Sequence, residues 1–384
     1  MANRRSSSQP NSSAQGCGND YLNKELWKLC AGPRVEIPRV GEKVFYFPQG
    51  SHGTSKLEAS TNQEQNPGIH LDLNTATKDL PPSKILCSVM NIQLLAGNDL
   101  EVYMQISLVP EQDQSEPTSP ESYPPEPSTP IGYSFCKVLT PSDAGSHGGF
   151  IVLKKHAECF PELDKNQEPP MQDLITKDLH GDIWQFRHVF KGKPKRHKLT
   201  TGWSKFVKEK KIVAGDSFVF LRGENGEMRV GLRRFAHQQC SMPSSQIPSE
   251  SIPQVVLGAA SSALATGTRF AVLIKPRMSQ FVIGFNKYQE AVSNSFAVGM
   301  KFKMRFDGED SLEKKFTGTI VGVEDLSSQW ENSKWRSLRV RWDEAASIAR
   351  PERVSPWEIE PFPPNNRAQP PCPSTGAPLV RRHR

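Results

Sequence analysis

Residues 217–234 read SFVFLRGENGEMRVGLRR, and this stretch decides the fold class. Two apolar runs of strand length flank Asn225-Gly226, a dipeptide typical of the tight turn in a β-hairpin. The preceding hundred residues add two strand patterns and two short helical patterns: YSFCKVL (133–139), DIWQFRHVF (182–190), IVLKKHAECF (151–160) and TGWSKFVKEKK (201–211). Short strands with two small helices in about a hundred residues predict a β-barrel or pseudobarrel.

The segment before this unit predicts a small sheet with a helix on it. Apolar residues recur at helical spacing in NDYLNKELWKLCAGP (19–33), and three strand-length pieces follow: KVFYFP (43–48), KILCSVMNIQLL (84–95) and LEVYMQISLV (100–109). Residues 110–130, PEQDQSEPTSPESYPPEPSTP, are acidic and proline-rich and cannot bury a face, so they predict a domain boundary.

The segment after the unit predicts further helices and strands and then a second small barrel. Residues 257–267 read LGAASSALATG, a run of small residues that alone favours an internally packed helix. Period-two alternation follows in three pieces, KFKMRF (301–306), KFTGTIVGV (315–323) and SLRVRWD (337–343). These predict an antiparallel barrel of roughly sixty residues.

Composition excludes several classes of protein. No apolar run approaches the ~20 residues of a membrane helix, and the first eighteen residues lack the apolar stretch of a signal peptide, so we expect a soluble intracellular protein. The seven cysteines contain no CxxC pair, which predicts reduced thiols and no metal site. Cys136, Asp143, Ser146 and His147 carry no nucleophile elbow or cofactor loop, so we expect no catalytic residues, no cofactor and no small-molecule substrate.

The positive charge of the chain is concentrated in residues 187–211, RHVFKGKPKRHKLTTGWSKFVKEKK. This window holds ten Lys or Arg and one Glu, which leaves 38 basic and 40 acidic residues elsewhere. A charge run is often only a solvated face. Here Gly192 and Pro194 stiffen the loop that we expect between a strand and a helix. Trp203 and Phe206 are expected to anchor that helix and turn its lysines outward. The pattern indicates nucleic-acid binding, with Lys193, Lys195 and Lys198 toward phosphates.

A second candidate segment, TPSDAGSHGGF, spans residues 140–150. A lone His in a loop is usually structural or merely exposed. Here Gly148 and its neighbour permit close backbone approach, and Ser142 and Ser146 offer hydrogen-bond donors. The loop could follow a DNA backbone while His147 reaches base edges.

Four quoted stretches resemble the B3-type DNA-binding domain of plant auxin response factors: FCKVLTPSDAGSHGGF, HAECFPELD, KDLHGDIWQFRHVFKGKPKRHKLTTGWSKFV and VAGDSFVFLRGENGEMRVGLRR. The flanks agree in ELWKLCAGP, VFYFPQG, KFKMRFDGED, FTGTIVGV, SKWRSLRVRWDE and RVSPWEIEP, so that the resemblance covers residues 20–362. It implies an α+β, mainly β fold in which a seven-stranded B3 pseudobarrel is inserted in a split dimerisation domain and followed by a small Tudor-like barrel.

The resemblance implies the following boundaries: a disordered segment 1–18, the N-terminal half of the dimerisation domain 19–109, a linker 110–131, the B3 domain 132–236, the C-terminal half of the dimerisation domain 237–298, the ancillary domain 299–362 and a disordered tail 363–384. It implies double-stranded DNA containing TGTC as the partner, homodimers or heterodimers with other auxin response factors, and the nucleus as location. Family members usually continue into a regulatory middle region and an interaction domain, whereas this sequence ends at Arg384. A protein that occupies promoter elements without an activation region competes with activators, so we expect repression by site occupancy.

The resemblance also implies roles for single residues. The residues that would read DNA bases are His147, Gly148, Lys191, Pro194 and Arg196. Those that would contact the DNA backbone are Lys137, Ser142, Thr201 and Ser204. Three positions depart from the usual pattern. Lys191 replaces an Arg and lacks its bidentate grip on guanine, Ile151 replaces a Ser, and Val255 replaces a Gly beside the expected dimer residues Leu257, Gly258, Ala259 and Ala260.

Two other readings stay open. Phe306, Phe316, Trp335 and Trp342 could form a cage for a methylated cation, which would make the last barrel a chromatin or protein interaction module. RNA binding would need exposed aromatic rings as stacking platforms, yet Trp203 and Phe206 stand at helical core spacing.

Overall fold

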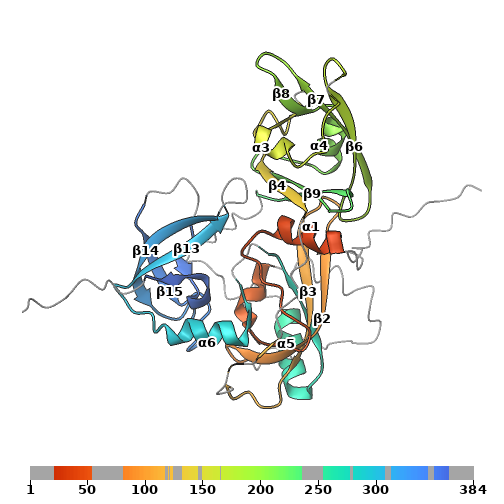
Figure 1. The fold of residues 1–384 in the computed structure, drawn as a ribbon. Coiled ribbons are helices and arrows are strands. Elements are labelled where there is room, and N and C mark those ends of the chain that lie inside the picture. The colour runs from red at the N-terminus through yellow and green to blue at the C-terminus, as the bar shows by residue number, and fades with distance from the viewer. Residues whose placement is uncertain are drawn as a thin grey trace, which may run out of the picture.

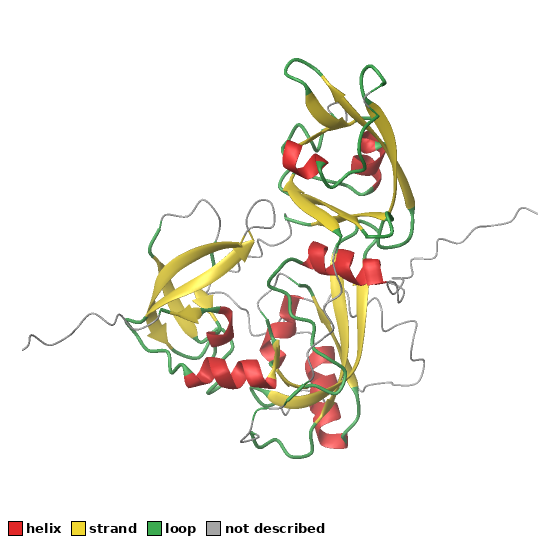
Figure 2. Ribbon diagram, viewed as in Figure 1, coloured by secondary structure: helices red, strands yellow, loops and turns green. Residues whose placement is uncertain are grey.

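Strands outnumber helices in the computed structural model of this chain, as Figure 2 shows. The structure describes residues 21–53, 81–116, 120, 122–123, 132–145, 149–164, 166–235, 254–276, 280–307, 313–344 and 350–362. The strands of these residues form three sheets, of five, seven and five strands. Figure 1 shows the seven-stranded sheet at the top, the first five-stranded sheet below it and the last sheet to the side.

The first sheet combines two distant segments of the chain. Its order is β11-β3-β2-β1-β12, with β1 (Lys43–Tyr46), β2 (Ile85–Ala96), β3 (Val102–Pro110), β11 (Phe270–Ile274) and β12 (Val282–Gly284). All neighbours are antiparallel, and Phe270 of β11 lies opposite Leu108 of β3. The short helix η1 (Pro48–Gly53) and helices α5 (Gln254–Thr266) and α6 (Phe285–Ser293) pack against it. The chain therefore leaves this sheet at β3 and returns beside the same strand.

The intervening chain forms the seven-stranded sheet, in the order β4-β9-β10-β6-β7-β8-β5. Its strands are β4 (Tyr133–Val138), β5 (Phe150–Val152), β6 (Met171–Lys177), β7 (Ile183–Lys191), β8 (Arg196–Leu199), β9 (Ser217–Arg222) and β10 (Met228–Arg233). The sheet curls around helices α3 (Lys154–Ala157) and α4 (Trp203–Glu209), as Figure 1 shows. β9 and β10 are the hairpin predicted around Asn225-Gly226.

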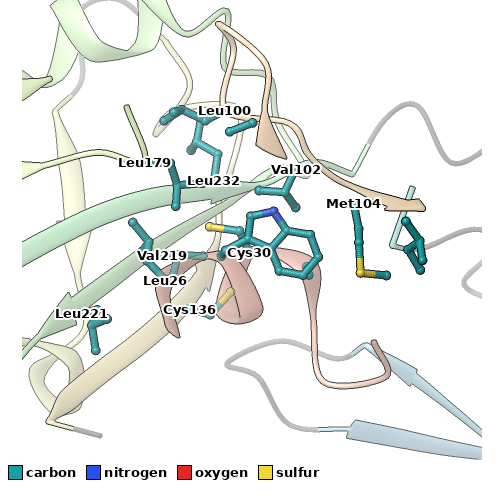
Figure 3. Packing of buried hydrophobic residues seen from close by; sticks show 14 of the residues in the cluster. Leu26, Cys30, Leu100, Val102, Met104, Cys136, Leu179, Val219, Leu221 and Leu232 are labelled. Atoms are coloured by element: carbon teal, nitrogen blue, oxygen red, sulfur yellow. The ribbon is translucent and has the colours of Figure 1, made fainter. Parts of the chain in front are cut away.

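Helix α1 (Tyr21–Ala31) joins the first two sheets into one core. It contacts β9 and β10 of the seven-stranded sheet and β3 of the first sheet. Figure 3 shows Leu26 and Cys30 of this helix among Val219 and Leu232 from one sheet and Val102 from the other. Because Gly231 has no Cβ, the Cys30 thiol can approach the backbone of β10. The two sheets therefore share one set of buried side chains.

The last sheet encloses a separate small core. Its order is β16-β15-β14-β13-β17, with β13 (Lys301–Asp307), β14 (Glu313–Val323), β15 (Leu338–Trp342), β16 (Arg353–Val354) and β17 (Glu360–Pro361). Phe302, Met304, Ile320 and Val340 alternate inward, as the period-two pattern predicted. The short helix η4 (Pro356–Glu358) packs against α6, and its Trp357 indole donates to the carbonyl of Gln280, two residues before β12, at 3.1 Å.

The mainly β fold predicted from the sequence is confirmed, with local differences. Residues 151–160 were expected to be one helix, but residues 150–152 form β5 because Phe150 and Val152 alternate into the core, and the helix is limited to α3. Strands β6 and β8 were not predicted. Four cysteines, Cys30, Cys87, Cys136 and Cys159, are buried free thiols as expected. The longest helix among the described residues, α5, has 13 residues, fewer than the ~20 that span a bilayer.

Candidate nucleic-acid interface

The first candidate segment, called the basic turn here, comprises residues 191–196 and closes the β7–β8 hairpin. Lys191 and Arg196 form the last rung of that hairpin, and all six residues of the turn are exposed. The sequence predicted a loop leading directly into a helix, which is wrong, because β8 intervenes. Leu199 is buried, and β8 pairs with both β7 and β5, so residues 196–199, which the sequence assigns to the basic loop, belong to the sheet. The cations are therefore carried on a short, rigid turn.

Two histidines behind the basic turn add no charge to it. His188 of β7 and His197 of β8 share a hydrogen bond of 3.0 Å between Nε2 and Nδ1. Burial, reinforced by the neighbouring His197, lowers the pKa of His188 to about 4. Burial also lowers the pKa of His197, with Lys154 acting in the same direction. Both rings are neutral at pH 7, so the positive field of the turn comes from Lys and Arg alone.

The second candidate segment, called the glycine loop here, comprises residues 140–149 and is organised by Asp143. This carboxylate is 2% exposed and accepts hydrogen bonds from the Thr140 amide at 3.1 Å, the Thr140 hydroxyl at 2.8 Å and the Ile151 amide at 3.2 Å. Lys137 adds an ion pair at 2.9 Å. Burial raises the pKa of Asp143, but hydrogen bonds from Lys137 and Thr140 outweigh it and hold that pKa below its usual value.

Lys137, which was expected to contact the DNA backbone, lies at the base of this loop. Its ammonium donates to Asp143 and to the Ile151 carbonyl at 2.7 Å, and it stands 4.5 Å from the centre of the Phe150 ring. Its side chain is only 13% exposed. In this geometry Lys137 fixes the loop to β5. The expected donor Ser142 is exposed, and its hydroxyl hydrogen-bonds that of Thr140 at 2.9 Å.

Helix α4 is tied to the glycine loop through Trp203. The indole N–H donates to the Asp143 carbonyl at 2.8 Å, and the ring stacks on Phe150 with centroids 4.6 Å apart. Trp203 and Phe206 are fully buried, which confirms the predicted anchoring of this helix, so these two rings cannot serve as stacking platforms for RNA. Thr201 and Ser204 remain exposed at the end nearest the loop.

The two segments border the same pair of strands. β5 pairs with β8 so that Phe150 lies opposite Leu199 and Val152 opposite His197. The glycine loop enters β5 at the Leu199 end, whereas the basic turn lies at the other end of β8. Gly149 has a φ of 64°, and a Cβ there would stand 2.8 Å from the Leu199 carbonyl oxygen, so this position requires glycine. Three predicted residues, Ser146, His147 and Gly148, lie outside the described residues.

The remaining predicted residues fall in two places. Lys193, Lys195 and Arg196 project from the basic turn, while Lys198 is half-buried within β8. On α5, Leu257 and Ala260 are buried against their own chain, and Gly258 and Ala259 are partly exposed. Val255 belongs to α5, but its side chain lies outside the described residues.

The aromatic rings of the last sheet do not form an empty cage. Phe306 packs edge-on against Phe316 and Trp342, with centroids 5.4 and 5.5 Å away. The guanidinium of Arg350 covers the Phe316 ring at 3.9 Å and the Trp342 ring at 5.4 Å. Trp335 lies apart, in the core shared by the first two sheets. The chain's own cation thus occupies the position that a methylated ligand would need.

Comparison with known proteins assigns the two main units. Residues 135–235 match the family described as B3 DNA binding domain, and residues 281–363 match the auxin response factor ancillary domain. Auxin response factor 11 of Arabidopsis thaliana is 56% identical over 352 residues, which cover 91% of this chain and 55% of that protein. The chain belongs to the auxin response factor family.

A second auxin response factor is covered to the same extent. Auxin response factor 7 of Oryza sativa subsp. japonica is 53% identical over 380 residues, covering 94% of this chain and 55% of that protein. The chain therefore spans about half the length of the curated auxin response factors that it matches. Among solved structures, the Arabidopsis FUS3–DNA complex matches 26% of this chain and 94% of that chain at 21% identity, with a TM-score of 0.23.

Asp143 is the residue of the interface whose role sequence reasoning missed. In the sequence it stands out only beside Cys136, Ser146 and His147, as a side chain of a type found in catalytic groups. The signal was present in TPSD, because Thr and Asp three residues apart form hydrogen-bonded turns that fix a loop. Its bonds to β5 and α4 depend on distant segments and could not be predicted.

Proposed function

We propose that this auxin response factor is a sequence-specific DNA-binding regulator of transcription. One observation carries the proposal: the basic turn and the glycine loop, which are separated in sequence, both border strands β5 and β8. Four exposed cations, Lys191, Lys193, Lys195 and Arg196, stand at one end of these strands. A rigid cationic turn suits a groove flanked by phosphates.

Within this proposal the two segments divide the work. The basic turn, through Lys191, Pro194 and Arg196, and the glycine loop, through His147 and Gly148, read base edges in TGTC elements. Ser142, Ser146, Thr201 and Ser204 contact the backbone, together with Lys193, Lys195 and Lys198. Lys137 supports these contacts from beneath, through Asp143.

The assembly and the biological effect belong to the same proposal. The first sheet and α5 form a dimer interface through Gly258 and Ala259, with a second copy or another auxin response factor as partner, so that paired elements can be read together. The protein acts in the nucleus and represses by occupying promoter elements. A promoter reporter tests this, since transcription that rises when the chain is added alone contradicts repression by occupancy.

Selection of bound sequences from random duplex DNA at two salt concentrations tests recognition. We expect a TGTC motif, often paired at a fixed spacing. Neutralisation of about six phosphates gives a slope near −5 in log K against log salt. Recovery of random sequences at both salt concentrations would overturn sequence-specific binding.

A further inference from the structure

The outer face of strand β5 carries apolar side chains that the proposed DNA contacts do not use. Phe150 and Val152 are 0% and 2% exposed and point into the core. Successive side chains of a strand alternate between its two faces, so Ile151 points outward. The backbone of Leu153 is still extended, with φ −66° and ψ 149°, and its side chain is 42% exposed. Ile151 and Leu153, called the apolar strip here, therefore follow each other along the outer face of the sheet.

Strand β8 places cations directly beside the apolar strip. Lys198 is the antiparallel partner of Ile151, and two residues further along the same register Arg196 comes beside Leu153. Side chains directly opposite each other share one face of a sheet. Arg196 in turn pairs with Lys191 of β7 at the base of the basic turn. The apolar strip is therefore the immediate neighbour of a residue that the proposed function assigns to base reading.

The apolar strip is also fixed to the glycine loop. The Ile151 amide donates to Asp143 Oδ1 at 3.2 Å, and the Ile151 carbonyl accepts from the Lys137 ammonium at 2.7 Å. Gly149, the last residue of that loop, stands two positions before Ile151. The strip thus lies between the glycine loop and the basic turn. A duplex that contacts both segments across this face meets the strip.

The chemistry of the apolar strip limits which part of a base it fits. Scattered apolar residues are ordinary on a protein surface, so exposure alone assigns no ligand to Leu153. Its place beside Lys198 and Arg196 does, because these cations pair with acceptor atoms, whereas the side chains of the strip have no hydrogen-bonding group. In the major groove the thymine edge presents a C5-methyl group next to its O4 acceptor. The TGTC element contains thymine, and its complement GACA does not, so every such methyl group of the element lies on one strand.

We propose that Ile151 and Leu153 contact a thymine C5-methyl group of the recognition element and thereby contribute to its selection. This inference rests on the proposed DNA binding. The contact adds specificity without charge, so its share of the affinity does not depend on salt, unlike that of the lysines. Burial of one methyl group against apolar side chains strengthens binding about fourfold.

The test measures binding of the full chain by fluorescence anisotropy to a duplex with one TGTC element and to the same duplex with deoxyuridine in place of thymidine in the element. This exchange removes the methyl group and keeps every hydrogen-bonding atom of the base. The same exchange at thymines outside the element controls for changes in the shape of the duplex.

The variant I151A/L153A, which truncates the apolar strip, is compared with I175A/I183A, which truncates exposed side chains of β6 and β7 in the same sheet. Ile183 begins β7, whereas the basic turn closes the other end of that strand. The readout is the ratio of the affinities for the thymine and the uracil duplex, taken within each variant. A smaller folded fraction lowers both affinities equally and therefore leaves this ratio unchanged.

The unaltered chain and I175A/I183A should bind the thymine duplex about fourfold more tightly than the uracil duplex, at low and at high salt alike, and I151A/L153A should bind the two about equally. A ratio near one for the unaltered chain, a ratio retained in I151A/L153A or lost in I175A/I183A, or the same ratio for exchange outside the element overturns the inference. If the unaltered chain prefers TGTC to scrambled DNA but is indifferent to the methyl group, only this inference fails. If it binds TGTC and scrambled DNA equally, the proposed recognition fails with it.

Discussion

The ion pair between Lys137 and Asp143 should hold the glycine loop in its binding conformation. Asp143 is 2% and the Lys137 side chain 13% exposed, so solvent screens this pair little. The substitution D143N leaves the Lys137 charge buried without its partner. Breaking a buried pair in this way costs about 3–5 kcal/mol of unfolding free energy. Because the same residue bonds Thr140 and Ile151, D143N should also weaken DNA binding at temperatures where the protein stays folded.

A double-mutant cycle separates this pair from general loss of packing. The free energy of unfolding is measured by urea denaturation, followed by circular dichroism, for the unaltered chain, D143N, K137M and the double variant. Since the double variant buries neither charge, its loss should be smaller than the sum of the single losses by about 1–3 kcal/mol. Single losses that add within about 0.5 kcal/mol would refute the reasoning, because uncoupled residues cannot be holding one loop together.

Three further predictions concern the same sheet. K191R should raise the preference for TGTC over scrambled DNA by ~1–3 kcal/mol in competition binding, and equal gains on both would contradict it. G202A should lower the free energy of unfolding by ~2–4 kcal/mol, because φ is 90° and a Cβ would collide with the Gln185 carbonyl; near-normal stability in urea would refute this. The pKa of His188 is depressed to about 4 in the folded protein, against about 6.5 in the unfolded chain. The contribution of this neutral ring to the free energy of unfolding is therefore complete above pH 6.5 and is lost as pH falls toward 4. The change is about 3 kcal/mol. Thermal unfolding of H188N should depend less on pH over that range, and an unchanged dependence would show that another group titrates.

The sequence predicts those features of this protein that depend on local pattern. Asn225-Gly226 marks the β9–β10 hairpin, and the spacing of Leu22, Leu26 and Cys30 marks α1. The charge imbalance of residues 187–211 identifies the basic turn because such a concentration of cations is visible without any fold. Trp203 and Phe206 were placed in the core for the same reason, since their helical spacing is local.

What escaped prediction depends on partners that are distant along the chain. The RHKL of β8 reads as a cationic loop, and only pairing with β5 and β7 makes it a strand. Likewise Asp143 is one acidic residue in a loop until Ile151 and Trp203 approach it. The neutral state of His188 and His197 arises from burial. The alternation of apolar and polar residues along β7 indicates that burial only for His188.

The return of the chain to the first sheet, where β11 pairs with β3, has a consequence for synthesis on the ribosome. β1 finds its edge partner β12, and β3 finds β11, only after residues 270–284 have emerged. The seven-stranded sheet is complete long before, at Arg233. The nascent protein must therefore carry a finished DNA-reading unit while its first sheet still lacks both outer strands. During that interval α1 can already cover β9 and β10, which shields the apolar residues of these two strands from other chains.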